Sequence, residues 1–124
     1  MKIEEIFVKS FVLDTKQKRV LYLLNSKHKR MEFARNLDFY LDRKYFHKYN
    51  TGCYSDIYPV LIQLGAPDIC YILSLKESID GSELRLRDAL YEDDILCYLS
   101  LLICIPNKLA FYADEDGHKY ILKR

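Results

Sequence analysis

The sequence contains no tryptophan, only 4 glycines and only 3 prolines among its 124 residues. The glycines are too far apart to form a Gly-rich phosphate loop, which excludes nucleotide-binding loops of the P-loop and Rossmann types. No internal repeat, low-complexity tract or Gly-, Ser- or Pro-rich linker divides the chain. We therefore expect a single domain over residues 1–124, with a helical half at about 1–65 and a sheet-containing half at about 66–124.

Long hydrophobic runs are also absent. The longest nearly apolar stretch, residues 95–105, is much shorter than the roughly 20 residues that a membrane-spanning helix needs. Near the N-terminus, Glu4, Glu5 and Lys9 flank or interrupt the short apolar run, which does not fit a secretory signal peptide. These features predict a cytoplasmic protein that does not cross a membrane.

Cysteine and histidine lack the spacing of a metal site. The chain has 4 cysteines and 3 histidines, with no paired zinc-ligand motif and no disulfide framework among them: Cys53, Cys70, Cys97, Cys104, His28, His47 and His118. Most of the cysteines have apolar neighbours, where a thiol packs as a small hydrophobic group. We expect reduced, structural thiols, no metal and no cofactor.

Acidic residues also fall short of a recognisable site. The segment Asp114–Gly117 resembles the start of a calcium-binding loop, but the residues that follow do not continue the roughly 12-residue ligand pattern. A hairpin turn explains this segment better, because Asp and Gly are typical turn residues. No nucleophile motif or carboxylate pair indicates a reaction. We therefore assign no catalytic residue, and an enzyme whose site is invisible in the sequence is the weakest alternative.

The residues that are present predict an α+β fold. Apolar positions three and four residues apart predict helices over residues 3–11, 14–24, 27–43 and 55–64. After residue 66 the pattern changes to short apolar runs between turn residues, which predicts strands at 69–75, 99–105, 109–112 and 118–122 and a short helix at 86–93. We expect three or four N-terminal helices packed on a small C-terminal antiparallel sheet that ends in a meander.

Charge is distributed very unevenly. Residues 1–50 carry 12 Lys and Arg against 6 Asp and Glu, whereas residues 51–124 carry 7 against 12. The formal net charge of +1 conceals this difference. Such asymmetry indicates either a charged partner or mutual neutralisation of the two halves within the fold, and the sequence leaves both open.

Tyrosines concentrate in the basic half. Residues 27–58 contain five tyrosines among seven basic residues, and Tyr and Arg are the side chains that protein interfaces favour. We place the binding surface on the connection 43–58 and the exposed face of the helix before it. The candidate binding residues are Lys29, Arg35, Arg43, Lys44, Tyr45, Lys48, Tyr49 and Tyr54. The alternative is an ordinary solvated helix face whose rings fold back onto the core.

These patterns favour a small non-enzymatic cytosolic protein that docks on another protein, as an inhibitor, immunity-type partner or adaptor. The alternative is a nucleic-acid-binding module that uses the basic segment 27–48. Dedicated nucleic-acid binders usually have a pI above about 9, whereas this chain has a pI of about 7.6. The identity of the partner and the oligomeric state do not follow from the sequence.

Overall fold

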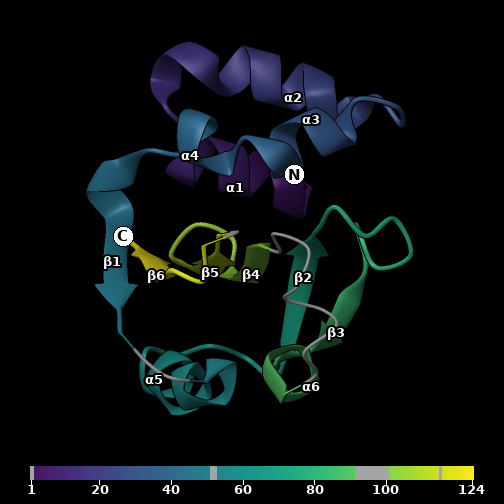
Figure 1. The fold of residues 1–124 in the computed structure, drawn as a ribbon. Coiled ribbons are helices and arrows are strands. Elements are labelled where there is room, and N and C mark those ends of the chain that lie inside the picture. The colour runs from purple at the N-terminus through teal and green to yellow at the C-terminus, as the bar shows by residue number, and fades with distance from the viewer. Residues whose placement is uncertain (1, 51–52, 92–100, 115) are drawn as a thin grey trace.

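A six-stranded antiparallel sheet forms the middle of the molecule, and helices cover both of its faces (Figure 1). The computed structural model describes residues 2–50, 53–91, 101–114 and 116–124. The predicted α+β class is confirmed, because helices dominate the N-terminal part and antiparallel strands the C-terminal part.

The N-terminal helices form the first layer. Their bounds are α1 (Ile3–Phe11), η1 (Asp14–Lys16), α2 (Gln17–Asn25), α3 (Arg30–Arg35) and α4 (Leu37–Tyr40). The single helix expected over residues 27–43 is therefore wrong, because two short helices meet at Asn36. The Asn36 side chain donates to the Glu32 carbonyl oxygen at 2.8 Å, and its backbone leaves the helical region. An Asn that bonds to its own preceding turn competes with continuation of the helix.

The connection that follows α4 contains more structure than expected. It comprises η2 (Arg43–Tyr45), strand β1 (Phe46–Tyr49) and η3 (Tyr54–Asp56), and helix α5 (Ile57–Gln63) comes next. Helix α5 agrees with the prediction for residues 55–64. Strand β1 lies in the connection expected between two helices, so the sheet takes one strand from the half of the chain expected to be helical.

The remaining elements complete the sheet. They are β2 (Ile69–Leu73), β3 (Glu83–Arg85), α6 (Leu86–Tyr91), β4 (Leu101–Ile105), β5 (Leu109–Ala113) and β6 (Lys119–Lys123). The strand order is β1-β6-β5-β4-β2-β3. Strands β4, β5 and β6 form the expected meander, whereas the short strands β1 and β3 were not predicted. Residues 92–100, which include the start of the strand predicted at 99–105, lie outside the described residues.

Two cores lie on the two faces of the sheet, as the alternation of a strand requires. Leu101 and Ile103 face helices α1–α4, where they pack with Phe7 and Phe33. Leu102 and the neighbouring strand residue Phe111 face α5 and α6 on the opposite side. Among the described residues, helices therefore cover both faces of the sheet, and β1 and β3 form its two edges.

Candidate functional site

Two aromatic rings mark the edge of the sheet where η2 leads into β1. Tyr45 is half-buried against the first core and meets the Phe11 ring edge-on, with centroids 5.6 Å apart. The ring of Phe46 lies 5.1 Å from that of Tyr120 and 6.1 Å from that of Tyr112. Packing against the core fixes both rings but leaves part of each accessible to solvent.

Three cationic side chains lie over these rings. The guanidinium of Arg43 is 5.3 Å from the Phe46 centroid, while Lys44 Nζ and the guanidinium of Arg124 are 5.1 Å and 5.0 Å from the Tyr45 centroid. Arg124 also donates to the Ser10 carbonyl oxygen at 3.1 Å, which holds it in place. We name this group the basic corner, consisting of Arg43, Lys44, Tyr45, Phe46 and Arg124.

Two carboxylates moderate the charge of the basic corner. Asp38 lies 3.7 Å from Arg43, and Asp42 lies 3.6 Å from Lys44. The side chains of Arg43 and Lys44 remain 62% and 66% exposed, so these ion pairs are weak. Hydrogen bonding to Tyr45 raises the pKa of Lys44, which keeps its ammonium charged.

The structure does not bring all eight candidate residues into one surface. Tyr49 is three positions beyond Phe46 on β1, and alternation places these rings on opposite faces of the sheet. Tyr54 packs with the second core, its ring 6.4 Å from that of Phe111 and 4.9 Å from Lys119 Nζ. Arg43, Lys44 and Tyr45 therefore share a surface that excludes Tyr49 and Tyr54. Lys48 is exposed on β1 itself.

Lys29 and Arg35 are exposed on the helical layer. Lys29 Nζ donates to the Tyr22 hydroxyl at 2.8 Å and thereby lowers the pKa of Tyr22. The Tyr22 and Phe39 side chains, which are 51% and 59% exposed, were not among the candidates, and Lys16 Nζ lies 3.2 Å from the Phe39 centroid. A tyrosine on the polar arc of the predicted helix 14–24 is the sequence signal that would have identified Tyr22.

The strongest ionic cluster lies at the other end of the helical layer. Arg30 on α3 donates to both Glu4 oxygens at 3.0 Å and 2.6 Å, to Asp80 at 2.9 Å and to the Leu24 carbonyl oxygen at 2.9 Å. The Tyr71 hydroxyl also donates to Glu4. This cluster joins α1, α3 and the segment between β2 and β3, and no sequence pattern predicted it because its members are far apart in the chain.

Arg30 is the shared counter-charge of the two carboxylates, Glu4 and Asp80. Burial alone would raise the pKa of Glu4, but the hydrogen bonds from Arg30 and Tyr71 and the charge of Arg30 outweigh burial and lower it. The hydrogen bond to Glu4 raises the pKa of Arg30 further, and burial together with Glu4 raises that of Tyr71 to about 12. A cavity of about 510 Å³ opens beside these groups. Because their charges are already paired, we interpret the cluster as structural.

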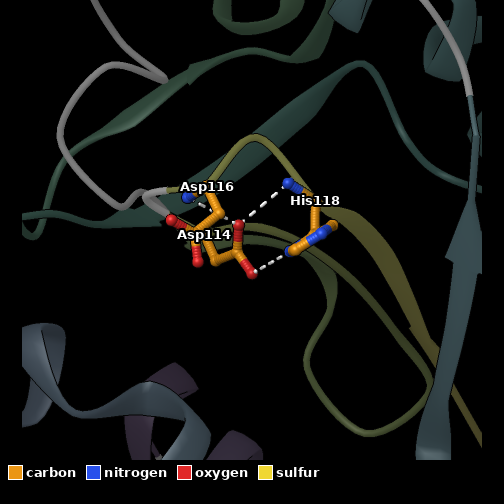
Figure 2. A group of neighbouring side chains, drawn as sticks. All are labelled: Asp114, Asp116 and His118. Carbon is orange, nitrogen blue, oxygen red and sulfur yellow. Dashed lines mark hydrogen bonds and ion pairs between the residues drawn. The ribbon is translucent and has the colours of Figure 1, made fainter.

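A second group of polar side chains lies in the turn between β5 and β6 (Figure 2). One ligand atom from each of Asp114, Asp116 and His118 lies within 4.8 Å of the others. The residues after Gly117 do not continue the calcium-loop ligand pattern, so this pattern did not indicate that His118 folds back onto Asp114. However, one Asp114 oxygen accepts the Asp116 and His118 amides at 3.0 Å and 2.8 Å, and the other lies 2.9 Å from His118 Nδ1. The turn itself explains this arrangement, so we assign no metal to it.

Two of the described cysteines have free thiols that are inaccessible to solvent. Cys70 and Cys104 are buried in the second core, and Cys53 is exposed. Burial raises the pKa of Cys70 to about 12 and also raises that of Cys104, as expected for structural thiols. Cys97 lies outside the described residues.

Comparisons with known proteins add no further constraint on the site. No protein-family model, curated protein or solved structure matches the chain. In the part of the chain that the structure describes, every helix is too short or too polar to span a bilayer. The function is therefore inferred from the chemistry of the surface.

Proposed function

We propose that the protein acts by binding another protein, without catalysis, and that the basic corner docks on a surface rich in carboxylates. One observation carries this proposal: Arg43, Lys44 and Arg124 lie over two half-buried aromatic rings at the open edge of the sheet. Rings of this kind supply apolar contact area, and the cations supply directional contacts to carboxylates.

The arrangement is suited to binding because it is already ordered. Tyr45 and Phe46 are held by the core, so their side chains lose little rotational freedom when a partner arrives. Arg43 and Lys44 remain largely in solvent, and their charges favour the approach of an acidic surface. Lys48 and Lys123 add exposed positive charge at the same sheet edge.

The same details support a protein partner over a nucleic acid. Asp38 and Asp42 lie beside the two exposed cations and would repel a phosphate backbone. The Tyr45 and Phe46 rings are flanked by the core and by cations, whereas single-strand binding needs open ring faces for base stacking. A partner protein can place its own basic groups beside the two aspartates.

Inhibition and adaptor roles fit this proposal, because both require a binding surface and no catalytic site. The thiols of Cys70 and Cys104, which form no disulfide, fit a reducing compartment and support a cytoplasmic location. We therefore retain the inhibitor, immunity-type partner and adaptor as the specific roles to be distinguished once a partner is identified.

The test reverses charge at the basic corner. The double variant Arg43→Glu, Lys44→Glu is compared with Arg85→Glu, Arg87→Glu, which makes the same charge change at exposed positions near the opposite sheet edge. Proteins captured from the source cell are quantified by mass spectrometry, and affinity for the recombinant partner is then measured by calorimetry. We expect at least about tenfold weaker binding for the corner variant alone, equal to about 1.4 kcal/mol.

Two results would contradict the proposal. Equal losses from both double variants would show a response to overall charge instead of the basic corner. The nucleic-acid alternative would be favoured if the parent protein captures RNA or DNA, the corner variant does not, and capture of no protein depends on Arg43 and Lys44.

A further inference from the structure

Strand β1 is an edge strand with one side open. It pairs with β6 in antiparallel register, from Phe46 opposite Leu122 to Tyr49 opposite Lys119. In the described parts of the chain, no element lies beyond β1 on its other side (Figure 1). An edge strand directs the N–H and C=O groups of alternate residues outward, where an additional strand can pair with them.

We propose that β1 accepts an extended acidic segment of the partner protein as an additional strand of the sheet. This inference rests on the proposed function and specifies how the partner binds. Main-chain hydrogen bonds to β1 supply affinity in such strand addition, and side chains on the two faces supply selectivity.

Charge complementarity identifies the added segment as acidic. Lys48 is exposed on the sheet face that carries Phe46, and His47 is exposed on the other face. Arg43 and Lys44 precede the strand, and β1 itself contains no carboxylate. Opposite charges on paired strands stabilise by about 0.2–1 kcal/mol per pair, whereas like charges destabilise.

Lysines on edge strands often prevent unwanted pairing, and that role is compatible with this proposal. Whether Lys48 prevents another strand from pairing with β1 depends on the charge of that strand. A second copy of β1 would bring another lysine and histidine beside Lys48 and His47, so self-pairing is disfavoured. An acidic strand meets attraction at the same positions.

Contacts at both ends hold strand β1 in place. Phe46 packs against Tyr120 at one end, and Tyr49 packs against the second core at the other end. These contacts lie on opposite faces of the sheet and restrain β1 from both sides. A partner strand therefore pairs with an edge that is already formed, which lowers the entropic cost of binding.

The experiment uses a short fluorescent peptide of alternating glutamate and valine with the full-length protein. Binding is followed by fluorescence anisotropy, and amide hydrogen exchange in β1 is followed by NMR. We expect binding to slow exchange of the outward-directed β1 amides at least tenfold. A peptide of alternating lysine and valine should not bind. The glutamate–valine peptide can be N-methylated at its odd-numbered or at its even-numbered amides, which are the two registers, and one of these two methylated peptides should not bind.

A charge reversal on the protein completes the test. The variant Lys48→Glu should weaken binding of the glutamate–valine peptide about threefold or more, because an attractive cross-strand pair becomes a repulsive one while Arg43 and Lys44 stay cationic. Arg85→Glu, at an exposed position on β3 at the opposite edge of the sheet, is the matched control and should keep the original preference.

Several outcomes would overturn strand addition. Binding that leaves β1 exchange unchanged, or that tolerates N-methylation in both registers, would mean that acidic side chains dock on the basic corner alone; the proposed function would then stand without this mode. Absence of peptide binding at millimolar concentration would reject the added strand, while the charge-reversal test on the partner still decides the proposed function. Protection of β1 in a dimer seen by sedimentation would identify a second copy as the occupant.

Discussion

Arg30 contacts two partly buried carboxylates and a backbone carbonyl oxygen with one guanidinium group. Its side chain and those of Glu4 and Asp80 are 19%, 17% and 10% exposed, so solvent screens them only in part. Removal of the cation would leave two carboxylates without their counter-charge. Breaking a buried pair in this way costs more than the intact pair contributes to stability.

We predict that Arg30→Met lowers the free energy of unfolding by about 2–3 kcal/mol, a figure reduced from the fully buried case for partial exposure. Arg35→Met on the same helix is the matched control, because Arg35 is exposed, and it should change stability by less than about 0.5 kcal/mol. Urea denaturation followed by circular dichroism measures both. Equal effects of the two substitutions would show that the cluster is not a structural connection.

Tyr71 predicts a loss of stability at alkaline pH. Its pKa is about 12 in the folded protein and about 10 in its ordinary state, because burial and the hydrogen bond to Glu4 favour the neutral phenol. A raised folded-state pKa means that the stabilisation is complete below pH 10 and is lost as the pH rises toward 12. Tyr71→Phe should show a shallower decline of unfolding free energy over this interval. A decline as steep as that of the parent protein would assign the alkaline loss to other groups.

At the scale of the elements, α3 and α4 offer a direct comparison of buried and exposed rings. Phe33 on α3 is fully buried in the first core, whereas Phe39 on α4 is 59% exposed beneath Lys16. We predict that Phe33→Ala costs about 3–5 kcal/mol of stability, and that Phe39→Ala costs less than about 1 kcal/mol. Thermal and urea unfolding measure both, and similar losses would contradict the separation of core and surface in these helices.

The sequence predicted elements whose apolar period is strong and continuous. Helix α1 is one example, because its buried residues include Phe7 and Phe11 four positions apart. Strands β4 and β5 are others, because they are continuous apolar runs in which every residue except Ile105 is buried. Strand β1 was missed because its sequence, FHKY, has half-buried residues at its ends and exposed ones between them. The break at Asn36 was missed because the apolar arc continues through it and only the local hydrogen bond stops the helix.

The candidate site was predictable to a similar extent. Arg43, Lys44 and Tyr45 are adjacent in the chain, so their proximity did not depend on the tertiary fold. The separation of Tyr45 from Tyr49 and Tyr54 did depend on it, because it follows from the pairing of β1 with the distant strand β6. Arg124 joined the surface for the same reason, and no local pattern indicates its contact with Tyr45. Phe46 follows Tyr45 directly in the chain.

At the scale of the whole molecule, the basic residues of the N-terminal half form ion pairs of two kinds. The pair Arg30–Asp80 joins the basic and acidic halves within the fold, whereas the ion pairs of Arg19, Arg43 and Lys44 stay within the basic half. Among the described residues, several exposed cations on the helical layer and near β1 thus produce a positive potential at the protein surface. This distribution favours association with an acidic partner.

The pairing of β1 with β6 also determines when the proposed binding edge forms during synthesis of the protein. While a ribosome is still adding residues 119–123, β1 has emerged but the strand it pairs with does not yet exist. Contacts between such distant segments form late, since a long loop must close before they can contribute. A nascent chain without β6 therefore lacks the sheet edge that we propose for recognition, and a partner that selects this edge distinguishes chains in which β6 has formed from chains in which it has not.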